Sequence, residues 1–447
     1  MIALGVNYLG AKVGTLAETR QGIVFEFDPA FLASGHDLSP LNLPLRTGIH
    51  QRDGIGSTRL LGLFEDSLPD RWGTRIMTEW FRKHGVPEHS VTPLARLGYV
   101  GSRGMGALSY EPAQEIVEFS HSREHFPLNQ IFEASEQVEN GGPIDLNVLA
   151  HVGSPAGGAR SKALIAIPTH SGYPIVAGDS TLPPGYEAWL VKFSGHRDPS
   201  AGVMEHAYAL MARAAGIDIP ETRLLRTERD GLLSQHFAVK RFDRKGNQRI
   251  HHHTLGGMTH TVGGDLSYET LLRATRRVTH DETEVWKAFR RAAFNVLASN
   301  RDDHGKNHGF IYDNRQWKLG PAYDLTFASE RMLAERGMSI AGERRAARIA
   351  ELGKLATTEA LDRHQANEII EQTRHAVSKW REFASAAGVP EIKAAEVESA
   401  LNFRQSGKSV ATPGHPAKED DRREITTGPS KATGRGPPIQ NERGRVK

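Results

Sequence analysis

Cysteine is absent from this sequence of 447 residues. Without it the chain has no disulfide framework, thiolate zinc site or cysteine nucleophile, so a bound metal would take oxygen or histidine ligands. Hydrophobic runs of the ~20 residues that a membrane helix needs are also missing. Residues 1–20 are interrupted by Asn7, Lys12 and Glu18, which is unlike the apolar stretch of a secretory signal. We therefore expect a cytoplasmic protein that makes no membrane contact.

Aromatic residues are missing from the C-terminal segment 404–447. This segment is rich in Gly, Pro, Ser and Thr, and its ten Lys and Arg against five Asp and Glu give it a charge of +5. The whole chain carries +3, so residues 1–403 carry −2 and the basic excess lies in the tail. Such a composition buries too little apolar surface to offset the entropy of ordering, and it predicts a disordered basic tail.

The rest of the chain has the composition of a globular protein, with 38 % hydrophobic and 24 % charged residues. Its length suits two or three units of roughly 100–200 residues each. Shifts in pattern predict a small N-terminal subdomain over 1–112, a connector and sheet-containing lobe over 113–245, and a helical lobe over 246–403. The predicted class is α+β with two lobes.

Hydrophobic periodicity places the main elements. Alternation over residues 1–28 predicts a half-exposed antiparallel sheet, and helical spacing follows from Asp70 to His84. The later elements are strands at 163–167, 189–193 and 236–240, a helix at 203–215 closed by Gly216, a helix at 281–299, a hairpin of 310–312 and 317–319, and then mostly helix to about 403.

The loop 300–307, between a predicted helix and the hairpin, carries an unusual density of polar side chains. Asp302 and Asn307 lie five residues apart, which is the offset between the base and the metal-binding asparagine of a protein-kinase catalytic loop. Asp324 follows seventeen residues after Asn307, where a kinase carries its second magnesium ligand. The alternative is a purely structural role, in which these polar residues cap a helix terminus.

Phosphoryl transfer requires hard oxygen ligands for Mg²⁺ and a carboxylate that accepts the hydroxyl proton. Asn307 and Asp324 can supply the first and Asp302 the second. Lys192, on a predicted strand, can neutralise phosphates if Glu205 on the next helix holds it by ion pairing. The glycine-containing segment 157–162 lets backbone N–H groups approach phosphates, and it comprises Gly157, Gly158, Ala159, Arg160, Ser161 and Lys162.

These motifs, in this order, resemble those of the HipA-like serine/threonine kinases, the toxins of bacterial toxin–antitoxin pairs. The resemblance also includes segments 64–69, 101–108 and 240–244 and spans most of the chain. It implies a two-lobed, protein-kinase-like fold with a small N-terminal subdomain and a helical C-terminal lobe. It also implies ATP and Mg²⁺ as cofactors.

The resemblance assigns roles to individual residues. Asp302 would be the catalytic base, Asn307 and Asp324 would hold Mg²⁺, and Lys192 with segment 157–162 would contact the ATP phosphates. Nucleotide or phosphate contacts are implied for His304 and Lys306, and backbone contacts to adenine for Lys240, Arg241 and Phe242. Ser154, just before the glycine-rich segment, is the candidate for the self-silencing phosphorylation known in this family.

The resemblance implies transfer of the ATP γ-phosphate to a Ser or Thr of a cellular protein, such as an aminoacyl-tRNA synthetase, with growth arrest as the result. A helix-turn-helix antitoxin would be the partner, and DNA would be contacted only through it. The alternatives are a kinase-like small-molecule phosphotransferase and a non-catalytic, DNA-bound regulator.

The run His251 to His253 resembles a metal tract, but consecutive side chains cannot all face one ion, so a solvated loop is expected.

Overall fold

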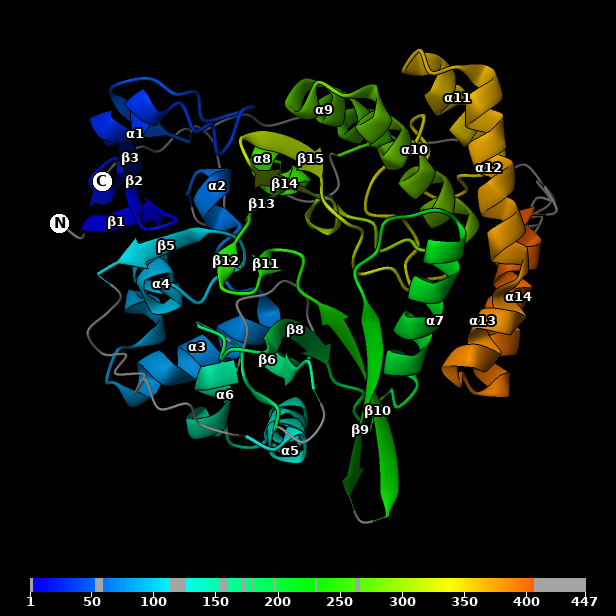
Figure 1. Ribbon diagram of the computed structural model, residues 1–447, viewed down its shortest axis with the longest axis horizontal. Coiled ribbons are helices and arrows are strands. Elements are labelled where there is room, and N and C mark those ends of the chain that lie inside the picture. Colours follow the sequence, from blue (N-terminus) through cyan, green and yellow to red (C-terminus); the bar gives the residue numbers. More distant parts are fainter. Residues whose placement is uncertain are drawn as a thin grey trace, which may run out of the picture. The chain divides into compact units, whose positions relative to one another are not determined.

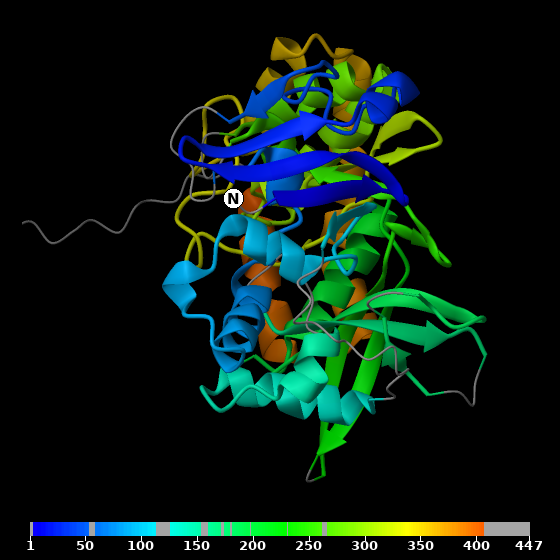
Figure 2. The same cartoon turned by 90° about the vertical axis from the view of Figure 1, so that its left-hand side faces the viewer.

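In the computed structural model, the described residues up to 405 belong to one compact unit (Figures 1 and 2). The structure describes residues 3–52, 59–112, 126–152, 160–170, 174–178, 181–196, 198–229, 231–261 and 266–405. The divisions predicted near residues 112 and 245 lie inside this unit and stay predictions. Apart from residues 404 and 405, the predicted disordered tail lies outside the described residues.

An antiparallel sheet with the strand order β4-β3-β2-β1-β5 dominates the N-terminal part. Ile23, Phe25 and Phe27 alternate on its buried face, which confirms the predicted half-exposed sheet. The strands are β1 (Ala3–Tyr8), β2 (Ala11–Thr19), β3 (Gly22–Phe27), β4 (Ile49–Gln51) and β5 (Leu108–Glu111). The helices here are α1 (Pro29–Ser34), α2 (Gly62–Glu65), α3 (Arg71–Lys83), η1 (Glu88–Ser90) and α4 (Pro93–Val100).

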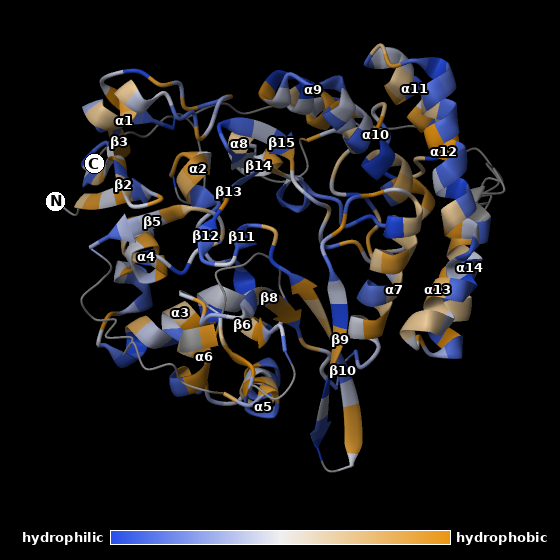
Figure 3. Cartoon of the chain, in the orientation of Figure 1, coloured by the Kyte–Doolittle hydropathy of each residue, from blue (hydrophilic) through white to orange (hydrophobic). Residues whose placement is uncertain are grey.

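The second sheet has the order β7-β6-β8-β10-β9. Its strands are β6 (Lys162–Pro168), β7 (Val176–Ala177), β8 (Tyr186–Lys192), β9 (Thr222–Arg229) and β10 (Leu232–Lys240). Hydrophobic residues concentrate on β6 and β8 (Figure 3). These strands form one buried hydrophobic cluster with helices α5 (Leu128–Glu139) and α6 (Leu146–Val152). Helix α7 (Ala201–Ala214) packs against β9 and β10. The strands and the helix predicted for this region are confirmed.

The third part is mainly helical and holds the small sheet β13-β14-β15. Its elements are β11 (Arg244–Lys245), β12 (Gln248–Arg249), β13 (His251–Thr254), α8 (Leu255–Thr259), α9 (Tyr268–Thr279), α10 (Glu282–Leu297), η2 (Gly305–Asn307), β14 (Gly309–Asp313), β15 (Gln316–Leu319), α11 (Ile349–Thr358), α12 (Arg363–Ser378), α13 (Trp380–Ala387) and α14 (Glu391–Gln405). The predicted hairpin is confirmed, but residues 320–348 form loops, so helix resumes later than predicted. Among the described residues, every helix falls short of the length and apolarity needed to cross a bilayer.

The histidine run is part of the core, and the prediction of a solvated loop is wrong. Strand β13 pairs with β14, and the side chains of His251 and His253 are buried. Nδ1 of His253 lies 2.6 Å from Asp66 Oδ2 and its Nε2 lies 3.0 Å from Ser39 Oγ. This order resembles a hydrolase triad, but Ser39 is 1 % exposed, so its hydroxyl meets no substrate. The hydrogen bonds instead join the N-terminal part to β13.

One hydrophobic cluster contains residues of the N-terminal sheet and of the C-terminal helices. Gly62 on α2 lies close against α8, because a Cβ there would overlap the carbonyl oxygen of Gly257. We expect Gly62→Ala to lower the free energy of unfolding by about 1–3 kcal/mol, measured by urea denaturation. Gly353→Ala is the control, since nothing lies within 4 Å of its added Cβ and helix α11 gains up to ~1 kcal/mol. Equal changes in both variants would contradict the close approach.

Candidate active site

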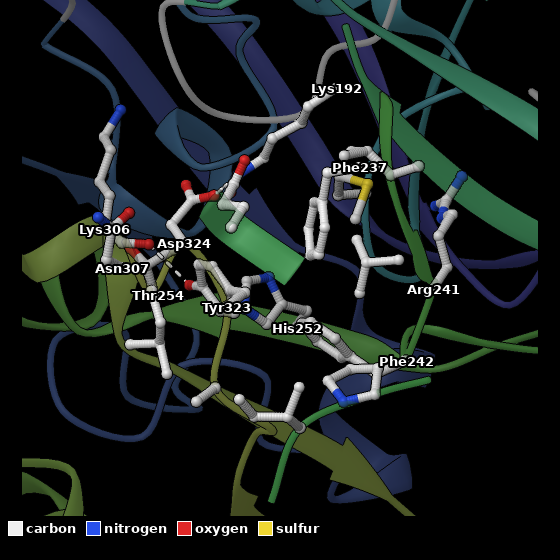
Figure 4. A pocket seen from close by; sticks show the side chains of 18 of the residues that line it. Lys192, Phe237, Arg241, Phe242, His252, Thr254, Lys306, Asn307, Tyr323 and Asp324 are labelled. Atoms are coloured by element: carbon white, nitrogen blue, oxygen red, sulfur yellow. Dashed lines mark hydrogen bonds and ion pairs between the residues drawn. The ribbon is translucent and has the colours of Figure 1, made fainter. Parts of the chain in front are cut away.

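A pocket of about 510 Å³ is lined by residues from all three parts of the chain (Figure 4). At its charged end lie Asp70, Lys192, Asp302, Asn307 and Asp324. Its apolar end is lined by side chains that include Met105, Leu190, Val239, Phe242 and Tyr323. The pocket therefore brings together the four residues that the sequence predicts for proton transfer, metal binding and phosphate neutralisation.

Lys192, at the end of β8, lies between two carboxylates. Its Nζ contacts Glu205 on α7 and Asp324, which is 132 residues further along the chain. Burial alone would lower the pKa of Lys192, but the carboxylates of Asp324 and Glu205 hold it above the usual value. The predicted ion pair between Lys192 and Glu205 is confirmed, and the ammonium group stays charged at the centre of the site.

Asp324 follows β15 in an unusual backbone conformation. Its φ of +54° lies in the left-handed region, which side chains other than glycine adopt at a cost. Burial alone would raise the pKa of Asp324, but the ammonium groups of Lys192 and Lys162 keep it below the usual value. The carboxylate is thus ionised and one quarter exposed at the pocket, as a metal ligand must be.

The loop 302–307 presents Asp302 toward solvent and folds Asn307 back on it. The amide nitrogen of Asn307 donates a hydrogen bond of 2.6 Å to the backbone carbonyl of Asp302. The Asp302 side chain is 55 % exposed, and its Oδ1 lies 3.8 Å from His304 Nε2. Among the described residues, no hydrogen-bond partner of this carboxylate is found, and the carboxylate is accessible from the pocket. His304 and Lys306 also line the pocket.

Asp303, which the sequence analysis did not select, is the structural member of this loop. Its side chain is fully buried, and its Oδ2 accepts hydrogen bonds from Arg336 Nη2 (2.7 Å) and Tyr268 Oη (2.6 Å). The backbone N–H of Gly337 donates to Oδ1 at 2.9 Å. Two adjacent aspartates thus point in opposite directions. Their sequence carries no sign of which one is buried, because Arg336 and Tyr268 come from distant segments.

The apolar end has the aromatic surface that a planar ring would contact. The rings of Phe242 and Tyr323 stack with centroids 5.8 Å apart, and His252 packs edge-on to both. The backbone N–H groups of Lys240 and Arg241 already donate to Glu221 and Ala188 at 2.9 Å. Of the three N–H groups predicted to contact adenine, those of Lys240 and Arg241 are therefore already engaged within the protein.

The side chains of Lys240 and Arg241 both form ion pairs within the protein. Lys240 Nζ lies 2.5 Å from Glu187 Oε1, and Arg241 forms a buried ion pair of 2.7 Å with Asp243. The Asp243 carboxylate also accepts a hydrogen bond from the backbone N–H of Gly106 at 2.7 Å. These contacts fix the chain where β10 ends beside the pocket.

The predicted phosphate segment is placed only in part. Gly157, Gly158, Ala159 and the candidate Ser154 lie outside the described residues. Arg160 pairs with Glu205 at 3.0 Å, and the backbone N–H of Ser161 donates to Glu139 at 3.1 Å. The Lys162 side chain is 1 % exposed, and its Nζ lies 3.9 Å from Oδ2 of Asp70, which lines the pocket. Arg160, Ser161 and Lys162 do not themselves line the pocket.

The donor set fits a magnesium ion that is bound mainly through its substrate. The described residues contain no group of three or more His, Asp or Glu side chains that could hold a metal. Asn307 and Asp324 both line the pocket. In Asn307 the side-chain nitrogen makes the hydrogen bond to Asp302, and the side-chain oxygen takes no part in that bond. Mg²⁺ commonly keeps waters and phosphate oxygens and takes only one or two protein ligands. Two oxygen donors that line this pocket therefore fit Mg²⁺.

Relatives among curated proteins match parts of the chain. The protein named "Putative kinase Y4mE" from Sinorhizobium fredii is 28 % identical over 72 % of this chain and 76 % of its own length. "Putative kinase Y4dM", from the same organism, is 34 % identical over 31 % of this chain. A "Putative kinase" from Haemophilus influenzae is 28 % identical over 32 % of this chain. The chain spans 37 % and 45 % of the lengths of these last two relatives.

A solved structure and two family matches cover most of the chain. The chain in the Shewanella oneidensis complex of HipA, HipB and operator DNA superimposes with a TM-score of 0.64 over 90 % of this chain and 96 % of its own, at 17 % identity. This likeness confirms the predicted two-lobed fold. Residues 4–111 match the HipA N-terminal domain, and residues 154–380, half of the chain, match the HipA-like C-terminal domain. The chain therefore belongs to the HipA-like family.

Proposed function

We propose that this chain is an ATP-dependent serine/threonine protein kinase of the HipA toxin type. The observation that carries the proposal is the convergence of Lys192, Asp302, Asn307 and Asp324 on one pocket with an apolar end. The names of the curated relatives, all kinases in their wording, support the same reaction class. An aromatic surface for a base, a fixed ammonium and two oxygen donors together suit Mg-ATP.

The chain's own residues divide the work of the reaction. Lys192, held by Glu205, neutralises phosphate charge, and its burial strengthens that interaction. Asp302 accepts the proton of the attacking Ser or Thr hydroxyl as the new oxygen–phosphorus bond forms and the bond to the ADP oxygen breaks. Asn307 and Asp324 would hold Mg²⁺, which when bound offsets the negative charge on the phosphates.

One solved complex supports the partners that we propose. That structure contains HipA, HipB and operator DNA, which supports an antitoxin partner for this chain, with DNA contacted through the antitoxin. We propose a helix-turn-helix antitoxin, a protein substrate such as an aminoacyl-tRNA synthetase, and growth arrest in the cytoplasm. Purification of the chain with the product of an adjacent short gene tests the antitoxin.

Phosphotransfer from γ-labelled ATP in a cell lysate tests the function. We expect label in a protein band with Mg²⁺ present, and a loss of about 10²-fold or more when a chelator removes the ion that would offset the phosphate charge. Restoring Mg²⁺ should restore the rate. Label that enters only a small metabolite would favour a small-molecule phosphotransferase, and no Mg²⁺-dependent label at all would favour a non-catalytic regulator.

A further inference from the structure

The segment between α2 and α3 brings the N-terminal domain into the charged end of the pocket. Asp66, Leu68 and Asp70 of this segment and Arg71, the first residue of α3, line the pocket, as Lys306 and Asp324 do. None of the four was selected from the sequence as a site residue. The wall that they form belongs to the N-terminal domain, whereas the predicted site residues all belong to the other two parts of the chain.

Hydrogen bonds anchor this segment to both of the other walls. The Asp66 carboxylate accepts from Thr254 N at 2.7 Å, from Thr254 Oγ1 at 2.8 Å and makes its contact with His253, which ties the segment to β13. Three residues beyond Pro69, the indole N–H of Trp72 donates to the carbonyl of Lys162 at 3.0 Å, which ties the segment to β6. Asp70 lies between these anchors and is held in place by them.

Asp70 faces Lys162, which begins β6. Asp70 Oδ2 lies 3.9 Å from Lys162 Nζ, and the lysine side chain is 1 % exposed. Burial lowers the pKa of Lys162 to about 8, while the carboxylates of Asp70 and Asp324 act in the opposite direction. Burial likewise raises the pKa of Asp70 to about 6, against the effect of Lys162. A buried ammonium requires such a neighbour to stay charged.

We propose that Asp70 is a positioning residue of the nucleotide site, which holds the Lys162 ammonium at the charged end where it favours the phosphates of ATP. This inference rests on the proposed function. Asp70 would act on Lys162 as Glu205 acts on Lys192, so that each lysine behind the phosphates has its own carboxylate. The N-terminal domain would then be a working part of the nucleotide site.

Calorimetry with ATP and with adenosine separates this role from a general structural one. In the full chain with Mg²⁺ present, we expect Asp70→Asn to weaken ATP binding about tenfold, the scale of one partly buried charge interaction. Adenosine carries no phosphate, so its affinity should stay within about twofold of wild type. Asp70→Glu restores the carboxylate and should keep ATP affinity within about threefold of wild type.

Two further variants sharpen the test. Lys162→Met should weaken ATP binding as Asp70→Asn does, and the double variant should be no weaker than either single one, because both remove the same interaction. Asp28→Asn is the matched control: this aspartate caps α1 in the same domain, away from the pocket, and its replacement should leave both affinities unchanged.

The outcomes are distinguishable. Unchanged or tighter ATP binding in Asp70→Asn, or a parallel loss for ATP and adenosine, would overturn the role of Asp70 and leave the proposed kinase intact. If Asp70→Asn fails to fold, Asp70→Glu and Lys162→Met decide by the same comparison of the two ligands. A wild-type chain that binds no ATP would overturn the proposed function and the inference together.

Discussion

Replacing Asp302 with asparagine should lower the rate of phosphotransfer by about 10³-fold, the contribution of a well-placed general base. The amide cannot accept the hydroxyl proton, although it fills the same space. ATP binding and the free energy of unfolding should stay close to wild type, because the carboxylate is 55 % exposed and accepts no hydrogen bond from another described residue. Single-turnover kinetics with labelled ATP, together with a denaturation curve, measure both effects.

The matched control for this variant is Asp281→Asn, which changes an exposed aspartate at the start of α10. Its rate should be that of wild type. A wild-type rate in Asp302→Asn would mean that another group accepts the proton, and full toxicity of that variant on expression would favour the non-catalytic regulator. Asn307 is unchanged in both variants. A rate that falls in Asp302→Asn but not in Asp281→Asn therefore identifies Asp302 as the proton acceptor.

Replacing Arg336 with methionine should lower the free energy of unfolding by about 3–5 kcal/mol. The methionine fills part of the space but leaves the fully buried Asp303 carboxylate without its charged partner. Arg336 Nη2 also donates to the carbonyl of Asn300 at 3.1 Å, so the loop that carries Asp302 loses a second contact. Urea denaturation measures the change, and phosphotransfer should fall with it, since Asp302 adjoins the disturbed residue.

The exposed ion pair of Arg345 with Glu335, 2.8 Å long, provides the comparison for this prediction. Arg345→Met should cost no more than ~1 kcal/mol, because water screens exposed charges. The double variant Asp303→Asn with Arg336→Met should recover part of the loss, since it removes the buried charge. Equal losses in Arg336→Met and Arg345→Met would show that burial of the first pair does not matter.

Local sequence pattern determined the secondary structure and the chemistry of the loop 302–307. Burial of one side of each element sets the two-residue alternation of β3 and the helical spacing of α7 and α10. Both patterns can therefore be recognised in the amino-acid sequence. The offset of Asp302 from Asn307 can also be recognised in the sequence, because both residues lie in one short loop. Lys192 and Glu205 each lie on a predicted element, and their ion pair was predicted from the sequence and is present in the structure.

Only the tertiary structure decided which polar residues are buried and with which partners. The three consecutive histidines have a polar composition that suits a loop, yet His253 is buried because Asp66, 187 residues away, accepts its hydrogen bond. The pairing of Asp303 with Arg336 and the contact of Asp70 with Lys162 join segments whose spacing follows no short period. A buried charge is stable only beside its counter-charge, and that neighbour is chosen by packing across the whole domain, which no local pattern encodes.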